Sequence, residues 1–262
     1  MKYTTIDFKL KDSIATIIFN RPDASNSINL ELAKDFMYAT MQCSENSAVR
    51  VVVITGAGKV FCPGGDVKSF AAQGKNLPYY LRDVTTYLHA AVSRLARLDA
   101  PVISAVNGVA AGAGMGLVCA SDFALAAESA RFTMAYTRIG LAPDGGSSYY
   151  LTRIVGLRKA MELTLTNHQL SATEALELGI VNQVVPDEEL TVKVESLANQ
   201  LASGATKAYG AAKRLLYNAW TETLETQMEL ESQTIAAMAH TEYAQEAIAA
   251  FVEKRTPRLK GQ

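Results

Sequence analysis

Short hydrophobic runs alternate with longer amphipathic stretches through the first half of the chain. Residues 14–19 (IATIIF), 49–55 (VRVVVIT) and 101–106 (PVISAV) are rich in β-branched side chains and are followed by glycine, asparagine or proline. Runs of this length and composition predict buried strands. Residues 30–42 and 79–98 carry apolar side chains at three- and four-residue spacing, which predicts helices. The alternation predicts an α/β core with a largely parallel sheet.

Beyond residue 147 the pattern becomes helical almost throughout. The segment Ser171–Glu174 has the sequence of a capping box, which marks the start of a helix. A brief strand is predicted at residues 180–185, and nearly everything after it reads as helix. We therefore divide the chain into an α/β core at residues 1–186 and a helical region at residues 187–262. Such a tail is typical of a small second domain or an oligomerisation element.

Composition narrows the function classes. The 262 residues are 49% hydrophobic, enough for one large core, and 25 basic residues balance 26 acidic ones. A net charge of −1 favours neither nucleic acid nor an anionic membrane as a partner. No run approaches the ~20 apolar residues of a membrane helix, and the N-terminus resembles no signal peptide, so a cytoplasmic location is expected. The three cysteines and three histidines show no zinc spacing, so we expect no structural metal.

A glycine-rich segment at residues 107–116 (NGVAAGAGMG) is the strongest local motif. It follows a predicted strand and opens a predicted helix at Leu117. Glycines remove side chains where a group must approach the backbone, and the N–H groups of a helix start favour negative charge. The segment therefore predicts an anion or oxyanion site, or else tight helix–sheet packing. Its spacing fits neither the dinucleotide fingerprint nor a phosphate-binding Gly-Lys-Ser/Thr loop.

Two further turns carry candidate chemistry. Residues 61–66 (FCPGGD) follow a predicted strand, and loops in that position lie at the ligand-binding edge of parallel sheets. They could supply a second backbone donor or form an ordinary connection. In the turn 140–149 (GLAPDGGSSY), Asp144 is either a buried functional acid or the N-cap of a helix that begins near Ser147.

Taken together, several segments of this chain resemble the crotonase (enoyl-CoA hydratase/isomerase) superfamily, in the same order. They are residues 20–22 (NRP), 49–58 (VRVVVITGAG), 61–66, 101–116, 130–132 (ARF), 179–186 (GIVNQVVP) and 250–255 (AFVEKR). The resemblance implies a spiral of ββα units followed by C-terminal helices that assemble trimers, commonly dimers of trimers. It also implies an acyl-CoA substrate, with coenzyme A as part of the thioester and no separate cofactor.

The same resemblance assigns roles to particular residues. The backbone N–H groups of Gly65 and Ala113 are implied to be the oxyanion donors that bind the thioester carbonyl. The positions implied to contact coenzyme A are Ala24, Ser25, Cys62, Gly64 and Asp66.

Two departures from the family pattern bear on the reaction. Hydratases of the family have two glutamates that position and deprotonate water. The matching positions of this chain are Gly116 and Tyr136. Ordinary hydration is therefore not expected. Asp144 remains, in a turn that resembles 3,2-enoyl-CoA isomerases of fatty acid metabolism and the ring isomerase of phenylacetate breakdown. The resemblance implies that Asp144 is the single base of a double-bond isomerase.

Two other activities within the superfamily stay open. The region after Asp144 also resembles 4-chlorobenzoyl-CoA dehalogenase, in which the aspartate is the nucleophile and a histidine, here His89, is the base. At the positions where that enzyme has the aromatic residues that hold the benzoyl ring, this chain has Leu88 and Tyr136. A hydratase-like branch binds AU-rich RNA through a lysine-rich helix. This chain has no dense Lys/Arg helix, so no nucleic-acid partner is expected.

Overall fold

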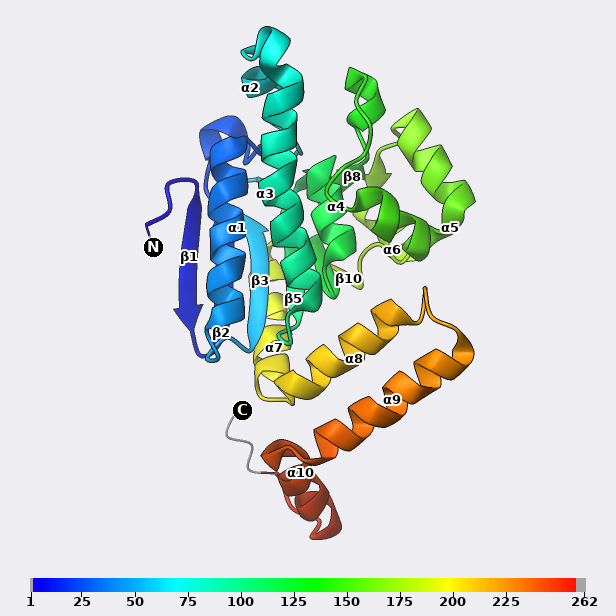
Figure 1. Cartoon of the computed structure of the whole chain (residues 1–262). Helices are drawn as coiled ribbons and strands as arrows, with labels where there is room; N and C mark the ends of the chain where they lie inside the picture. Colours follow the sequence, from blue (N-terminus) through cyan, green and yellow to red (C-terminus); the bar gives the residue numbers. More distant parts are fainter. Residues whose placement is uncertain (1, 258–262) are drawn as a thin grey trace.

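Two sheets of different size form the centre of the molecule. Figure 1 shows the computed structural model, which describes residues 2–257. The larger sheet has the order β1-β2-β3-β5-β7-β10, and the smaller one has the order β4-β6-β8-β9. The larger contains β1 (Ile6–Lys11), β2 (Ile14–Phe19), β3 (Val51–Gly56), β5 (Val102–Val106), β7 (Phe123–Ala127) and β10 (Gln183–Val185). The smaller contains β4 (Val60–Cys62), β6 (Val109–Ala111), β8 (Arg131–Thr133) and β9 (Leu170–Ser171).

The strands come in pairs that are divided between the two sheets. β3, β5 and β7 each lie in the larger sheet, and the strand that follows each of them lies in the smaller sheet. A helix or helical segment follows every pair, and pairing between successive units is parallel in both sheets. The predicted spiral of ββα units is therefore confirmed, and the single predicted sheet is in fact two.

The helices follow the sequence pattern closely. They are α1 (Leu30–Glu45), α2 (Val67–Ala71), α3 (Leu77–Arg97), α4 (Ala113–Ala120), α5 (Ser147–Thr166), α6 (Ala172–Glu177), α7 (Leu190–Ala202), α8 (Thr206–Asn218), α9 (Leu224–Ala239) and α10 (Glu242–Val252). The short 3-10 turns of the described residues are η1 (Pro22–Ala24), η2 (Gly74–Asn76), η3 (Tyr136–Ile139) and η4 (Asp187–Glu189). The predicted capping box at Ser171 and Glu174 is present at the start of α6.

Both faces of the central strands are buried. The main core lies between the larger sheet and α1 and α3, where Phe19 and Phe36 meet edge to face with their ring centroids 5.1 Å apart. On the opposite face α7 packs Leu190 and Val194 against β3 and β5. Burial on both faces explains why β3 reads as a continuous hydrophobic run rather than an alternating one.

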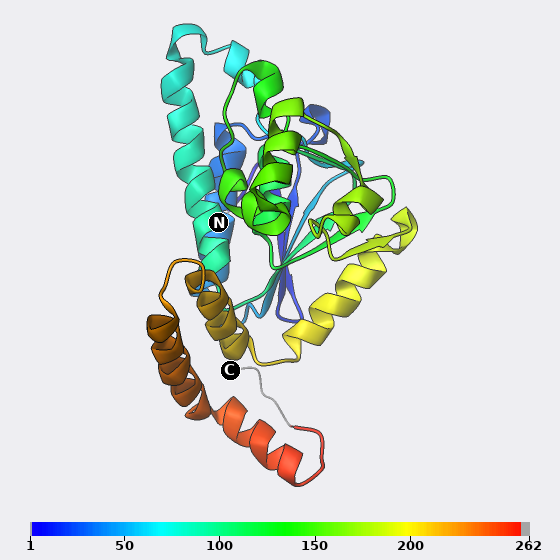
Figure 2. The ribbon, with the colours of Figure 1, turned by 90° about the vertical axis from the view of Figure 1, so that its right-hand side faces the viewer.

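The last helices extend away from the sheets (Figures 1 and 2). α8 packs against α3 and is tied to the core by an ion pair between Lys213 and Asp122, with Nζ 2.6 Å from Oδ2. α9 and α10 project beyond it, and Phe251 and Ile235 are 86% and 73% exposed. The boundary that we predict at residue 186 precedes α7, which packs on the sheet, so the extended part begins with α8.

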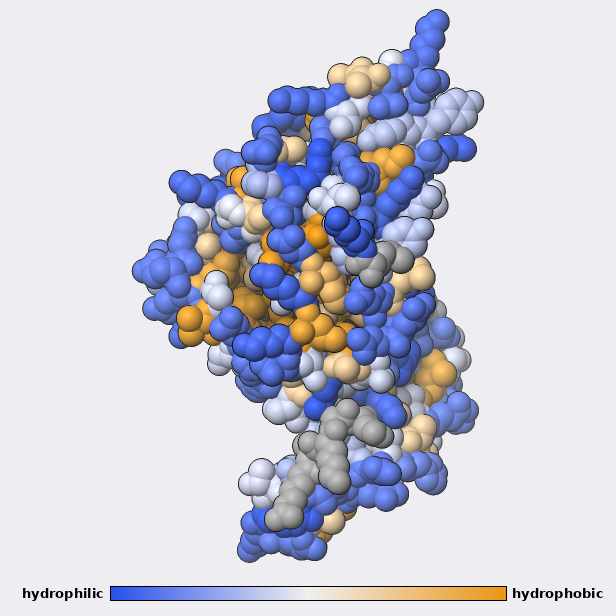
Figure 3. All heavy atoms as spheres, turned by 90° about the vertical axis from the view of Figure 1, so that its left-hand side faces the viewer, coloured by the Kyte–Doolittle hydropathy of each residue, from blue (hydrophilic) through white to orange (hydrophobic). Residues whose placement is uncertain are grey.

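A groove with a partly apolar lining lies at the β1 edge of the larger sheet. Figure 3 looks onto this edge and shows hydrophobic side chains gathered in a hollow. A groove of about 700 Å³ runs between the sheet and α7, lined by Ile14, Ile18, Val53 and Val194 among others. The β2 side chains on this face, Ile14, Thr16 and Ile18, are only half-buried, so this sheet face stays partly open.

Candidate active site

Glycine lets the two predicted donor loops touch. Gly64 has φ +93°, and a Cβ at this position would lie 2.9 Å from the carbonyl oxygen of Ala111. A Cβ on Gly114 would lie 2.0 Å from the carbonyl oxygen of Cys62, which is too close for any side chain. The loop after β4 and the start of α4 therefore pack backbone to backbone. Tight packing, one of the two alternatives considered from the sequence, is therefore present here.

Two backbone N–H groups at this contact donate no hydrogen bond within the described residues. Within residues 2–257, neither the N–H of Gly65 nor that of Ala113 has a hydrogen-bond acceptor. Ala113 is the first residue of α4, so the helix begins four residues before the predicted start at Leu117. The positive end of the helix dipole thus lies at the Ala113 N–H, where it favours a negatively charged oxygen. Both residues line one cavity.

The cavity has a volume of about 280 Å³ and is largely apolar. Its wall includes Phe70 from α2, Val84 and Leu88 from α3, and Ile139 and Leu141 from the segment around η3. Gly65, Ala113, Tyr136 and Asp144 line the same space. A site of this kind is suited to an apolar group with one polar centre, which here is a pair of donors and a carboxylate.

Asp144 contributes the carboxylate. Its backbone oxygen accepts hydrogen bonds from the N–H and the Oγ of Ser147, at 3.0 and 2.7 Å. The N-cap of α5 is Gly146, so the side chain of Asp144 does not cap the helix. The capping role considered from sequence is therefore excluded, and the carboxylate is free to face the cavity.

Tyr136 binds this carboxylate directly. Its hydroxyl donates to Asp144 Oδ1 at 2.6 Å. Burial raises the pKa of the phenol, and the neighbouring charge of Asp144 raises it further. Tyr136 therefore stays protonated and remains a hydrogen-bond donor. The sequence drew attention to position 136 only because hydratases of the family have a glutamate there.

His89 holds the same turn from the other side. Its Nε2 accepts a hydrogen bond from the N–H of Gly145 at 3.0 Å. This nitrogen is therefore unprotonated, with the ring proton on Nδ1. His89 is not among the residues that line the cavity, but it lies beside the candidate base.

Gly116, the second position at which hydratases carry a glutamate, packs beneath the Asp144 turn. A Cβ on Gly116 would lie 3.0 Å from Cβ of Ser147 and 3.7 Å from the carbonyl oxygen of Gly145. A longer side chain here would have to displace Ser147 and, with it, the turn that carries Asp144. The packing around position 116 therefore leaves no room for a glutamate side chain unless Ser147 moves.

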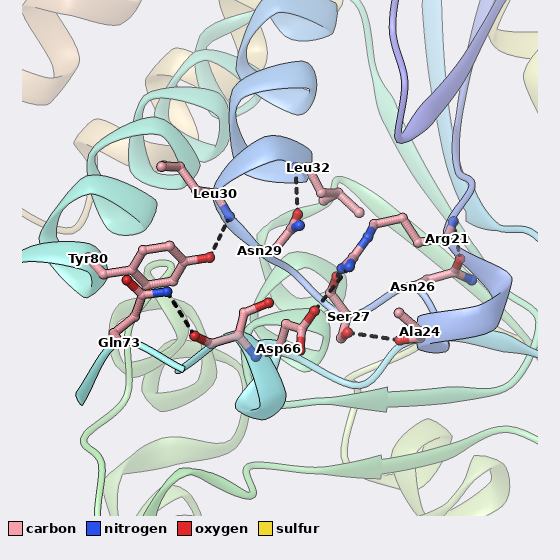
Figure 4. A network of polar contacts seen from close by, with 11 residues as sticks. Arg21, Ala24, Asn26, Ser27, Asn29, Leu30, Leu32, Asp66, Gln73 and Tyr80 are labelled. Atoms are coloured by element: carbon pink, nitrogen blue, oxygen red, sulfur yellow. Dashed lines mark hydrogen bonds and ion pairs between the residues drawn. The ribbon is translucent and has the colours of Figure 1, made fainter. Parts of the chain in front are cut away.

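None of the five residues predicted to contact coenzyme A is among the described residues that line the cavity. Figure 4 shows Arg21 against Asp66, with Nη2 3.0 Å from Oδ2, and Ala24 in the same loop. Burial alone would raise the pKa of Asp66, but hydrogen bonds from Ser69 and Arg21 lower it overall. Asp66 also caps α2 by accepting from the N–H of Ser69. Its carboxylate thus fixes the two loops to each other.

The other predicted positions are dispersed. Ser25 is exposed at the end of η1, and Gly64 lies at the contact of the two donor loops. The side chain of Cys62 is fully buried, and burial raises the pKa of its thiol to about 12. Any contact of Cys62 with coenzyme A would therefore be through its backbone. The contacts of these residues with coenzyme A stay a prediction.

Sequence reasoning missed several residues of the cavity wall. Phe70, Leu81 and Thr85 belong to amphipathic helices in which nothing distinguishes cavity-facing from core-facing side chains. Arg138 also lines the cavity, two residues after Tyr136 in the sequence. The sequence carries no signal for it, because this turn depends on Ala135 at φ +55°, a conformation that an alanine does not predict.

Known proteins share this architecture over the whole chain. The chain is 37% identical over 253 residues to the 1,2-epoxyphenylacetyl-CoA isomerase of Escherichia coli K12, covering 96% of this chain and 97% of the relative. It is also 37% identical over 245 residues to 4-chlorobenzoyl coenzyme A dehalogenase-2 of an Arthrobacter species, covering 93% and 88%. A putative enoyl-CoA hydratase structure from Streptomyces coelicolor A3(2) superposes with a TM-score of 0.94 at 33% identity, covering 100% and 96%.

A ββα spiral with two free backbone donors above an apolar cavity defines a crotonase-fold enzyme that acts on acyl-CoA thioesters. The sequence model of the family described as Enoyl-CoA hydratase/isomerase matches residues 9–262, and the chain belongs to this family. No helix in the described part of the chain combines the length and hydrophobicity that a membrane crossing needs.

Proposed function

We propose that this enzyme shifts a carbon–carbon double bond of an enoyl-CoA or a ring acyl-CoA, with Asp144 as its single base. The observation that supports the proposal most is the composition of the cavity wall. It carries one carboxylate beside two free N–H donors, and the positions of both hydratase glutamates are occupied by residues without a carboxylate. The likeness to an isomerase named for a ring acyl-CoA supports the same reaction class.

The reaction needs only these groups. Asp144 removes a proton from C2 of a 3-enoyl thioester, and the electron pair moves into the thioester carbonyl to form an enolate. The N–H groups of Gly65 and Ala113 stabilise the enolate oxygen, each by about 3–4 kcal/mol in the transition state. The protonated Asp144 then returns its proton to C4, the double bond moves to C2–C3, and the carboxylate is regenerated. A positioned general base of this kind contributes typically about 10²–10⁴-fold.

Coenzyme A enters this scheme only as part of the substrate, and no separate cofactor takes part. We propose that its contacts come from Ala24, Ser25, Cys62, Gly64 and Asp66, with the Arg21–Asp66 pair fixing the two loops that carry them. The proposed location is the cytoplasm, where acyl-CoA thioesters of fatty acid metabolism are available.

A panel of acyl-CoA thioesters tests the proposal. It should include 3-hexenoyl-CoA, crotonyl-CoA and 4-chlorobenzoyl-CoA, assayed for isomerisation, hydration and chloride release. We expect isomerisation to dominate and hydration of crotonyl-CoA to be at least ~10²-fold slower, because positions 116 and 136 hold no carboxylate to activate water. Hydration at the rate of a dedicated hydratase would overturn both the proposal and the assignment of these two positions.

Dehalogenation is the second candidate, and one contact favours it. His89 lies on the N–H of Gly145, the residue after Asp144, so a histidine and an aspartate come close together as that reaction requires. In this reaction Asp144 would displace chloride from the ring, and His89, once its Nε2 releases the N–H of Gly145, would activate the water that hydrolyses the aryl ester. The 37% identity to an Arthrobacter dehalogenase adds support. Chloride release from the panel would select this candidate.

We also propose that the enzyme is a homotrimer or a dimer of trimers. The extended helices α9 and α10 expose Ile235, Ile248, Phe251 and Val252, each more than 60% exposed in a single chain. Apolar surface of this extent is expected to be buried between subunits. Light scattering at micromolar concentration should give three or six times the 28.2 kDa of the chain. A monomer under these conditions would contradict the proposal.

A further inference from the structure

We propose that Tyr136 is a positioning residue that fixes the Asp144 carboxylate so that one oxygen, Oδ2, both removes and returns the substrate proton. This inference rests on the proposed isomerase function. It gives Tyr136 a role of its own, beyond filling the space of an absent glutamate.

The hydrogen bond is held from both ends. Tyr136 O accepts from the N–H of Leu141 at 3.1 Å, and its own N–H donates to the carbonyl oxygen of Met134 at 2.7 Å. The next residue, Thr137, donates to the carbonyl oxygen of Thr164 at 3.0 Å, which ties η3 to the end of α5. On the other side, Ser147 holds the backbone of Asp144 at 2.7 Å. The phenol and the carboxylate are therefore placed by separate, anchored segments.

The contact divides the two carboxylate oxygens into different roles. Oδ1 accepts from the Tyr136 hydroxyl at 2.6 Å. Within the described residues Oδ2 has no hydrogen-bond partner, and it is not buried, so another molecule can reach it. Because Asp144 lines the cavity, Oδ2 is the oxygen that is available to the substrate. A hydrogen bond to one oxygen resists rotation about Cβ–Cγ, since rotation would exchange Oδ1 with Oδ2.

The arrangement persists through the proton transfers. The raised pKa of the Tyr136 phenol keeps its proton in place, so Tyr136 donates and does not transfer. When Oδ2 takes the proton from C2, Oδ1 is the carbonyl oxygen of the acid and still accepts from Tyr136. The proton then stays on Oδ2, inside a largely apolar cavity, until it passes to C4. Both transfers must occur on one face of the substrate, and the proton that leaves C2 should be the one that arrives at C4.

A label experiment tests this role. The substrate is 3-hexenoyl-CoA with two deuterium atoms at C2, incubated in ordinary water. Mass spectrometry of the product measures deuterium at C4. We expect the wild type to carry label to C4, and Tyr136→Phe to lose most of it, because an unheld carboxyl group rotates and exchanges its deuteron with water. The kcat of the variant should fall about 10–100-fold, with KM changed less than about twofold.

Tyr3→Phe is the matched control. Tyr3 also donates from its hydroxyl to a side-chain oxygen, Gln42 Oε1 at 2.9 Å, but it lies outside the cavity. This variant should keep kcat and the label. Binding of 2-hexenoyl-CoA to Tyr136→Phe checks that the site is still folded.

The outcomes separate the two levels of the proposal. A wild type that does not isomerise 3-hexenoyl-CoA contradicts the proposed function itself. An active wild type whose Tyr136→Phe variant keeps both kcat and C4 label contradicts only the role of Tyr136. Loss of product binding together with activity would assign Tyr136 to the fold of the cavity and would also overturn the positioning role.

Discussion

Asp144→Asn is expected to lower the kcat of isomerisation by about 10²-fold or more. Asparagine preserves the shape of the side chain, and its amide oxygen would still accept the hydrogen bond from Tyr136, which in the wild type spans 2.6 Å. The amide cannot take a proton at neutral pH, so the variant lacks the base while the cavity wall is unchanged. Binding of the acyl-CoA product should persist within a few-fold. Steady-state kinetics and product titration measure the two effects separately.

Two results would count against this account of Asp144. Activity within tenfold of the wild type would mean that another group removes the proton. A covalent adduct on Asp144 would mean that the residue is a nucleophile instead. Mass spectrometry of a His89→Gln variant incubated with 4-chlorobenzoyl-CoA looks for this adduct, since the variant lacks the base that would hydrolyse it. An adduct together with chloride release would replace the isomerase assignment with the dehalogenase.

The longer elements of the fold were predictable because their hydrophobic periods repeat. Residues 14–19 form β2 with the predicted bounds, and α1 and α3 begin within two residues of their predictions. The strands of the smaller sheet were not predicted. β4, β6 and β8 have three residues each, too few for a period of two to show. The resemblance to a known family, not the periodicity, supplied the ββα spiral.

The candidate site divides in the same way. Glycine spacing and the turn around Asp144 pointed to the loops that line the cavity, because close approach of two backbones requires glycine. The contacts of Tyr136 with Asp144 and of His89 with Gly145 leave no such mark. The second joins residues 56 positions apart on different elements, so only the folded chain shows it. From the sequence, Tyr136 was notable only because it stands where hydratases have a glutamate. In the structure its hydroxyl donates a hydrogen bond to the carboxylate of Asp144.

The donor role of Ala113 gives the other large expected effect, through Ala113→Pro. Ala113 is the first residue of α4, a position at which proline is well tolerated because the missing N–H has no intrahelical partner. Gly112 before it has φ +51° and ψ −124°, outside the α region that a following proline disfavours. The helix should therefore form. The proline removes one of the two oxyanion donors, and a carbon of its ring enters the space that the thioester carbonyl oxygen of the substrate would occupy.

We expect the kcat of Ala113→Pro to fall by about 10²–10³-fold, the usual effect of deleting one oxyanion donor. Glu242→Pro is the matched control, because Glu242 is exposed and is also the first residue of its helix, α10. It should melt close to the wild type and keep its activity. Free coenzyme A has no acyl carbonyl, so it should bind Ala113→Pro as it binds the wild type. If the variant binds coenzyme A normally and turns over within tenfold of the wild type, the thioester oxygen does not lie at the Ala113 N–H, and the enolate must be stabilised elsewhere.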